Sequence, residues 1–166
     1  MKRLCVLVCL CVLFAGCGKQ KQYETLSDPC FTEQQQAPGV ILISVPYDLA
    51  APVIQTESGD RLYIGDDYTV TIQTMTGGDL DATLKSCTGF ERDRLTVLET
   101  EKDGMKRYDC AWTAAAEESQ SVGRITILED ADYHYVLTVT APGSKIDAMT
   151  AAWAELSDSF CVSTVQ

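Results

Sequence analysis

The sequence contains no asparagine and only one histidine among its 166 residues. A single histidine, His134, cannot build the multi-histidine site of a catalytic zinc ion. The chain also lacks the glycine-rich loops that bind nucleotide phosphates and the GxSxG turn that presents a nucleophilic serine. From these absences we expect neither a cofactor nor a metal centre.

Positive charge is scarce as well. Lys and Arg number 13 against 24 Asp and Glu, and the formal net charge is −11. Because a negative surface repels phosphate backbones, nucleic acid is not an expected partner. The simplest reason for such a charge is solubility.

An apolar run lies near the start of the chain, between Leu4 and Phe14, after the cations Lys2 and Arg3. As a helix this run would be roughly 16 Å long, about half of a hydrocarbon core of about 30 Å. The run is too short for a good membrane span. Two cations, an apolar stretch and then small residues are typical of a secretory signal.

The run ends in Phe14-Ala15-Gly16-Cys17, which resembles the lipobox of bacterial lipoproteins. In that family the cysteine receives a diacylglyceryl group and the signal peptidase cuts just before it. The resemblance implies a signal peptide over residues 1–16, lipidation of Cys17, and a membrane bound through that lipid. Two acyl chains give stable anchoring. We therefore expect the protein at the cell membrane, lipid-anchored and facing outside the cytoplasm. The alternative is an ordinary secretory signal with a chance cysteine.

Residues 17–38 are polar, and their only large apolar side chains are Tyr23, Leu26 and Phe31. This composition predicts a flexible tether that follows the lipidated cysteine. Residues 39–166 are expected to form a single globular domain.

Four cysteines follow Cys17, and the export signal makes disulfides possible. They are Cys30, Cys87, Cys110 and Cys161, and no two have CxxC spacing. Cys87 is expected on the apolar face of a short helix and Cys110 on the core face of a strand, so these two could meet. Cys30 and Cys161 would then be left to each other. The alternative is buried free thiols.

Alternating apolar residues and turn signals divide the rest of the chain. They predict strands over 40–45, 53–56, 61–64, 68–73, 95–100, 105–113, 124–128, 133–140 and 160–165. One short helix is expected from Asp79, ended by Gly89, and a second after Ser144 as N-cap. The order indicates an α+β fold, an antiparallel sheet flanked by helices.

In the last third of the chain, strands over 124–127 and 133–141 precede a helix and a closing Ser159-Phe160-Cys161-Val162 strand. This order resembles that of PsbP-like proteins. The resemblance covers residues 40–165 and implies an α/β/α sandwich around an antiparallel sheet. The resemblance also implies protein binding or an accessory role, and the family offers no catalytic residues to assign to this chain.

Three functional classes remain open. The favoured one is a membrane-anchored, non-enzymatic binding or accessory module with a protein partner at the cell surface. The second is a hydrolase or thiol enzyme using His134, although a partly exposed strand histidine is the simpler interpretation. The third is a carrier of a small apolar ligand, with the pocket lined by aromatic side chains: Tyr108, Trp112, Tyr135 and Trp153.

Acidic residues cluster at 66–67, 79–81 and 129–132. Calcium binds several oxygens brought together, but none of these clusters has the spacing of a calcium loop. Asp is also favoured at turns and helix starts, where its side chain caps backbone N–H groups. We expect the clusters to have this capping role, and calcium binding stays an open alternative.

Overall fold

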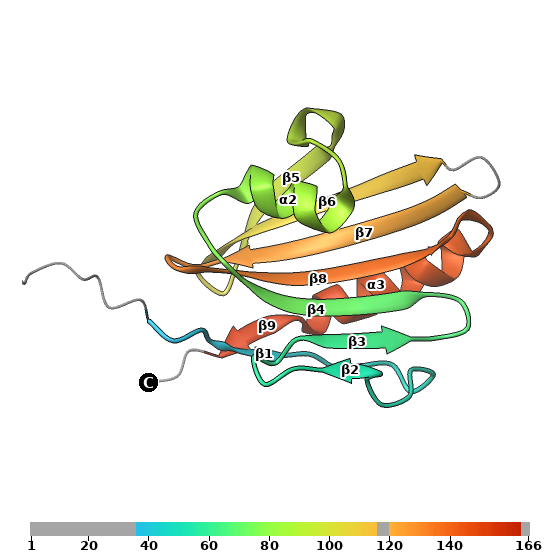
Figure 1. Cartoon of the computed structure of the whole chain (residues 1–166), viewed down its shortest axis with the longest axis horizontal. Helices are drawn as coiled ribbons and strands as arrows, with labels where there is room; N and C mark the ends of the chain where they lie inside the picture. The colour runs from blue at the N-terminus through green and yellow to red at the C-terminus, as the bar shows by residue number, and fades with distance from the viewer. Residues whose placement is uncertain (1–35, 116–119, 164–166) are drawn as a thin grey trace, which may run out of the picture. The chain divides into compact units, whose positions relative to one another are not determined.

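A computed structural model describes residues 36–115 and 120–163. Within these residues, seven strands form one antiparallel sheet in the order β2-β3-β4-β8-β7-β6-β5. Their bounds are β2 Ile54–Gln55, β3 Arg61–Ile64, β4 Thr69–Thr76, β5 Thr96–Lys102, β6 Met105–Ala115, β7 Gln120–Glu129 and β8 Tyr133–Pro142. Strand β8 lies at the centre, between β4 and β7 (Figure 1).

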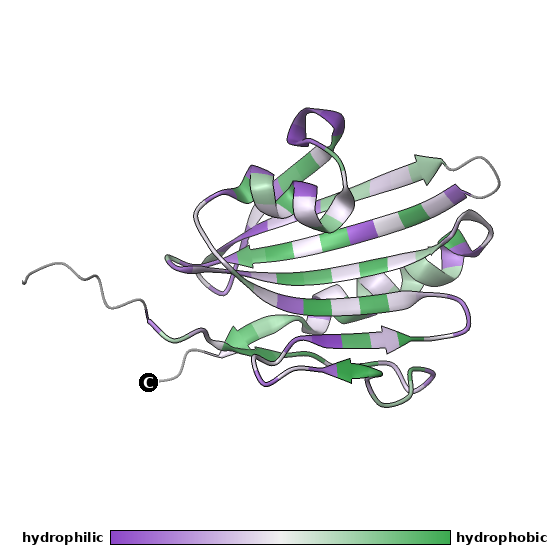
Figure 2. Ribbon diagram, viewed as in Figure 1, coloured by the Kyte–Doolittle hydropathy of each residue, from purple (hydrophilic) through white to green (hydrophobic). Residues whose placement is uncertain are grey.

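One helix covers each face of this sheet. Helix α2 (Leu80–Thr88) lies in front of the sheet in Figure 1, and α3 (Ile146–Ser159) lies behind it. Since side chains alternate along a strand, each central strand contributes residues to two hydrophobic cores, one on each face of the sheet. On β8, Tyr135, Leu137 and Val139 belong to the α3 core, whereas Val136 belongs to the α2 core. Figure 2 shows the matching alternation of hydropathy along β4 and β7. The predicted α+β sandwich is therefore confirmed.

The two ends of α2 have the expected caps. The Asp79 carboxylate accepts from the backbone N–H groups of Asp81 and Ala82, at 3.0 and 3.1 Å. Gly89 closes the helix with a φ of 79°, in the left-handed region that glycine adopts without strain.

The prediction of Ser144 as the N-cap of α3 is wrong. A 3₁₀ turn, η2 (Gly143–Lys145), precedes the helix, and Lys145 occupies the cap position without a side-chain hydrogen bond. Pro142 starts this turn, and the chain enters α3 through it. The Lys145 ammonium instead pairs with Asp67, at 2.6 Å.

The first and last strands pair with each other. β1 (Val40–Leu42) and β9 (Cys161–Ser163) form a separate two-stranded antiparallel sheet. Strand β1 is shorter than the predicted 40–45 run and is not a buried strand, because Val40 and Leu42 are about half exposed and only Ile41 is buried. Neither described helix is long and apolar enough to cross a bilayer.

Candidate functional site

Helix α3 covers only part of its face of the sheet. Several side chains on this face are exposed, in β5 and in the second half of β6. They are Thr96, Leu98, Thr100, Ala111 and Thr113. Leu98 keeps 61% of its surface exposed, a high value for a leucine in a sheet. The uncovered strip between α3 and β5 is called the α3–β5 groove below.

Two adjoining cavities make up this groove. The larger, of about 370 Å³, lies between the start of α3 and the outer strands, and Phe90, Thr113, Ile146 and Met149 are among its lining residues. The second, of about 330 Å³, is lined by Leu98, Asp109 and Trp153, among others. Thr96, Ala111 and Arg124 line both cavities, so the two adjoin.

The groove is positively charged in an acidic protein. Arg94 and Arg124 line the larger cavity, and no Asp or Glu of the described residues does. Most other cations of the described chain already have acceptors. Lys85, Arg92, Arg107 and Lys145 pair with carboxylates, while Arg61 and Lys102 donate to backbone carbonyls. Among residues 36–115 and 120–163, neither groove arginine has a carboxylate partner, and the groove can therefore accept an anionic group.

Arg124 is held by an aromatic ring. Its guanidinium lies 4.8 Å from the centre of the Trp153 ring, which is a cation–π contact. Such a contact fixes the arginine without neutralising its charge. Trp153 lies in the middle of α3, so this contact also joins the helix to β7.

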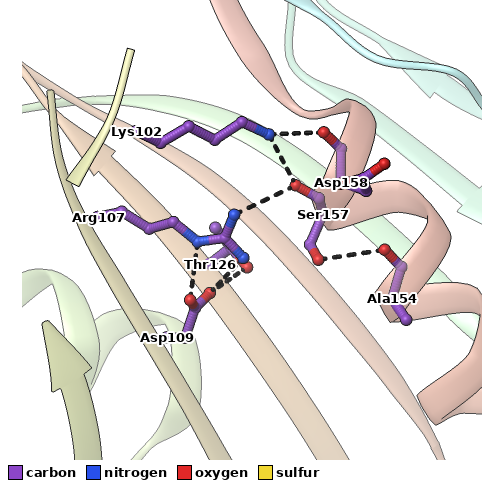
Figure 3. Close-up of polar contacts among 7 residues, drawn as sticks. All are labelled: Lys102, Arg107, Asp109, Thr126, Ala154, Ser157 and Asp158. Carbon is purple, nitrogen blue, oxygen red and sulfur yellow. Dashed lines mark hydrogen bonds and ion pairs between the residues drawn. The ribbon is translucent and has the colours of Figure 1, made fainter. Parts of the chain in front are cut away.

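The C-terminal end of α3 is fixed to β5 and β6 by a polar cluster (Figure 3). Lys102 Nζ donates to the carbonyl oxygens of Asp158 and Ser157, at 2.6 and 3.2 Å. Arg107 Nη1 reaches the Ser157 oxygen at 3.4 Å. Cations are favourable at this end of a helix because its last carbonyls carry partial negative charge. The contacts hold one end of α3 against the outer strands, and the larger cavity of the groove lies at the other end of the helix.

Asp109 balances the charge within this cluster. Its carboxylate accepts from Arg107 Nε at 2.7 Å and Nη2 at 3.2 Å, and from the Thr126 hydroxyl at 2.6 Å (Figure 3). The Arg107 and Asp109 side chains are only 16% and 15% exposed. Asp109 is thus the acid of the second cavity, and its charge is already matched.

Strand β6 is longer than its outer neighbour. β5 pairs with β6 from Lys102↔Met105 to Thr96↔Ala111 and then ends. β6 continues to Ala115, and there it pairs only with β7. Within the described chain, residues 112–115 therefore leave their outer backbone edge unpaired, and the larger cavity adjoins it through Trp112 and Thr113.

His134 is inside the molecule, so the expectation of a partly exposed histidine is wrong. Its side chain has no exposed surface, and Nδ1 lies 2.8 Å from the Thr83 hydroxyl of α2. Burial lowers the pKa of His134, although Glu129, Asp130 and Asp79 act in the opposite direction. A neutral, enclosed imidazole bonded to a threonine has no access to a substrate.

Cys87 and Cys110 lie in the α2 core, as their positions in the pattern predicted. Both are free thiols in the structure, as is Cys161, and Cys87 Sγ is 3.8 Å from Met75 Sδ. Burial raises the pKa of Cys87 and raises that of Cys110 to about 11. A high pKa disfavours the thiolate that a nucleophile needs. A bridge between Cys87 and Cys110 stays a prediction, and Cys30 lies outside the described residues, as does Cys17.

The acidic clusters have structural partners. Asp79 caps α2, and Asp81 accepts from Arg92 at 3.2 Å. Asp130 accepts from the backbone N–H groups of Asp132 and Tyr133 and from the Tyr135 hydroxyl. In the described residues no group of three or more potential ligand side chains is arranged to hold a metal ion.

The four aromatic residues considered for a ligand pocket are divided by the fold. Tyr108 and Tyr135 are core residues, 5% and 0% exposed. Trp112 and Trp153 line the groove cavities. The sequence pattern missed the groove itself, because it forms where α3 stops covering the sheet. The presence of Arg94 before β5 and Arg124 within β7 was the available signal.

No family model matches this chain, and no curated protein does. Solved structures do match in fold. LpqN of Mycobacterium tuberculosis, described as involved in cell envelope biogenesis, has a TM-score of 0.52 at 12% identity, with 76% of this chain and 86% of that one covered. CyanoP, the cyanobacterial PsbP of Synechocystis sp. PCC 6803, has a TM-score of 0.50 at 9% identity, with 81% and 99% covered.

The fold is PsbP-like. A Bacteroides thetaiotaomicron protein also matches, with a TM-score of 0.50 at 14% identity, and the alignment covers 75% of this chain but only 45% of that one. At such identities the likeness is one of fold, and the side chains of the groove have to be interpreted on their own chemistry.

Proposed function

We propose that this chain is a lipid-anchored accessory protein of a bacterial cell envelope, which binds a protein partner through the α3–β5 groove and catalyses no reaction. The observation that carries the proposal is the groove itself. It combines exposed apolar side chains such as Leu98 and Ile146 with two arginines that no described carboxylate neutralises. An apolar surface with a few charged groups is typical of a site for recognition.

Two further observations support the envelope location. The Phe14-Ala15-Gly16-Cys17 sequence resembles a lipobox. LpqN, a protein involved in cell envelope biogenesis, has a similar fold. A polar segment of about twenty residues would span roughly 25 Å as a flexible coil, and it would let the domain search near its anchor.

The chemistry of the interior argues against catalysis. His134 is enclosed and bonded to Thr83, and burial raises the pKa of both Cys87 and Cys110. Catalytic groups need an accessible position and a pKa near the working pH. A carrier of a small apolar ligand is also less well supported, because the groove is open and carries two guanidinium groups.

Photo-crosslinking in the native cells tests the proposed surface. A benzoylphenylalanine at Thr113, which lines the larger cavity, should give a discrete protein adduct. The same probe at Ile54, an exposed apolar residue of β2 (54% exposed), is the matched control on another part of the sheet. Equal adducts at both positions, or none at Thr113, would contradict binding at the groove.

Fractionation tests the anchor separately. The Cys17→Ser variant should leave the membrane fraction or remain uncleaved, because it has no thiol to receive the lipid. A variant that is cleaved and still sediments with membranes would show that lipid on Cys17 is not the anchor. The lipidated chain should also gain the mass of a diacylglyceryl group.

A further inference from the structure

We infer that the α3–β5 groove takes an extended acidic peptide segment of the partner, which adds as a strand to the free edge of β6 at residues 112–115. The inference rests on the proposed function and specifies its partner chemistry. Three independent features of the described chain support it: an unpaired backbone edge, two uncompensated guanidinium groups beside it, and apolar side chains exposed next to both.

The backbone edge is the first feature. β6 pairs with β5 only as far as Ala111, and residues 112–115 pair on one side only, with β7. Unpaired N–H and C=O groups on a strand edge are a template for another strand. Peptides bind to many domains by adding to such an edge, with main-chain hydrogen bonds supplying affinity. The place that a longer β5 would fill is therefore open to an extended segment.

The charge of the groove favours an acidic peptide segment. Arg94 precedes β5 and Arg124 lies on β7, so the two line the cavity from different parts of the chain. The rest of the protein is acidic, with a formal net charge of −11. An acidic segment is repelled by most of this surface and attracted at the groove, which favours correct placement over nonspecific contact. Arginine also binds carboxylates with two parallel hydrogen bonds.

The apolar lining adds a second requirement. Ile146, at the start of α3, is 47% exposed. The side chains of Thr96 on β5 and Thr113 on β6 are exposed beside it. Side chains two apart on an extended peptide lie on the same face. A segment with an acid and an apolar residue two positions apart would therefore reach an arginine and the apolar surface from one side.

Fluorescence anisotropy with the detergent-solubilised full chain tests the inference. The probe is a fluorescein-labelled peptide with the sequence Thr-Asp-Thr-Val repeated twice, which places acid and valine on one face. Two control peptides replace Asp by Asn, or replace the central Thr by proline to block strand pairing. We expect saturable binding of the acidic peptide and about fivefold or greater weakening with either control, since both charge and edge pairing contribute.

Protein variants locate the effect. Arg124→Gln and Arg94→Gln should each weaken binding by about fivefold. Lys106→Gln is the matched control, because Lys106 is an exposed cation of β6, the strand with the free edge, and lines neither cavity. Arg94 is exposed, so its variant should fold normally even if loss of the Arg124–Trp153 contact destabilises the other. Hydrogen exchange should slow in residues 112–115 on peptide binding.

Several results would overturn the inference. Equal binding of the Asp and Asn peptides would show that charge has no role. Equal binding of the proline peptide and the acidic peptide would show that the peptide does not pair with the edge of β6. Binding of phosphatidylglycerol vesicles that depends on Arg94, with no binding of the peptide, would assign the groove to anionic lipid. If none of the probes binds, the proposed acidic peptide segment is also refuted. If the Thr113 crosslink nevertheless forms in cells, the proposed function stands and only its peptide chemistry fails.

Discussion

The Arg107–Asp109 pair should contribute measurably to stability, because both side chains are largely shielded from water. The perturbation is a double-mutant cycle with Arg107→Met, which keeps the aliphatic stem, and Asp109→Asn, which keeps an acceptor for Thr126. Removing one member of a fully buried pair costs about 3–5 kcal/mol. Exposed pairs are worth about 0–1 kcal/mol.

The exposures of 16% and 15% place the pair between those limits. We expect Arg107→Met to lower the free energy of unfolding by about 2 kcal/mol, since it leaves a shielded carboxylate with only Thr126. The double variant should lose less than the sum of the single variants, with a coupling energy of about 1–2 kcal/mol. Urea unfolding followed by far-UV circular dichroism measures all four proteins.

The chain supplies its own control pair. Arg92 and Asp81 lie 3.2 Å apart, but their side chains are 43% and 60% exposed. The same cycle on this pair, Arg92→Met with Asp81→Asn, should give a coupling energy too small to resolve, because water screens both charges. If the two cycles give equal coupling, shielding from water is not the source of the Arg107–Asp109 contribution and the reasoning is wrong.

Three further predictions concern the α2 side of the sheet. Gly123→Ala should cost about 1–3 kcal/mol in urea unfolding, because its Cβ would lie 2.6 Å from Trp112 Cε2 and the indole would have to move; an unchanged midpoint would contradict this. Burial lowers the folded-state pKa of His134. The wild-type protein should therefore lose stability as pH falls below about 6.5, more steeply than His134→Asn, and parallel pH profiles would refute the claim. Mass spectrometry after non-reducing alkylation in denaturant tests the bridge that the sequence pattern predicts between Cys87 and Cys110: a joined pair would add about 3 kcal/mol of stability, whereas alkylation of both thiols would exclude the bridge and match the free cysteines of the structure.

Much of the fold could be predicted from the sequence, because strand alternation and turn chemistry are local signals. Tyr68, Val70 and Ile72 alternate with polar residues and are all buried on one face. The Lys102-Asp103-Gly104 turn joins β5 and β6 as the Asp-Gly signal predicted, and Asp103 and Gly104 both have positive φ. Gly89 ends α2 for an equally local reason.

The features that sequence reasoning missed depend on packing between distant segments. Ser144 looks like an N-cap, but the chain turns through η2 before α3 begins. His134 looks like an exposed strand-end residue, yet α2 folds over it and Thr83 bonds to it across 51 positions. The groove depends on which part of the sheet α3 leaves uncovered, which no local pattern in α3 or β5 records.

The Tyr135 hydroxyl has a mechanical consequence if the domain is pulled from its N-terminal side. It donates to Asp130 Oδ2 at 2.7 Å and accepts from the Gly39 N–H at 2.8 Å, near the first described residues. Tension transmitted along the chain toward Gly39 would therefore reach β8, the central strand of the sheet, as well as the short β1–β9 pair. Strand β9 follows α3 directly, so the same tension would also reach the helix that forms one wall of the groove, whereas β5 and β6 lie outside this path.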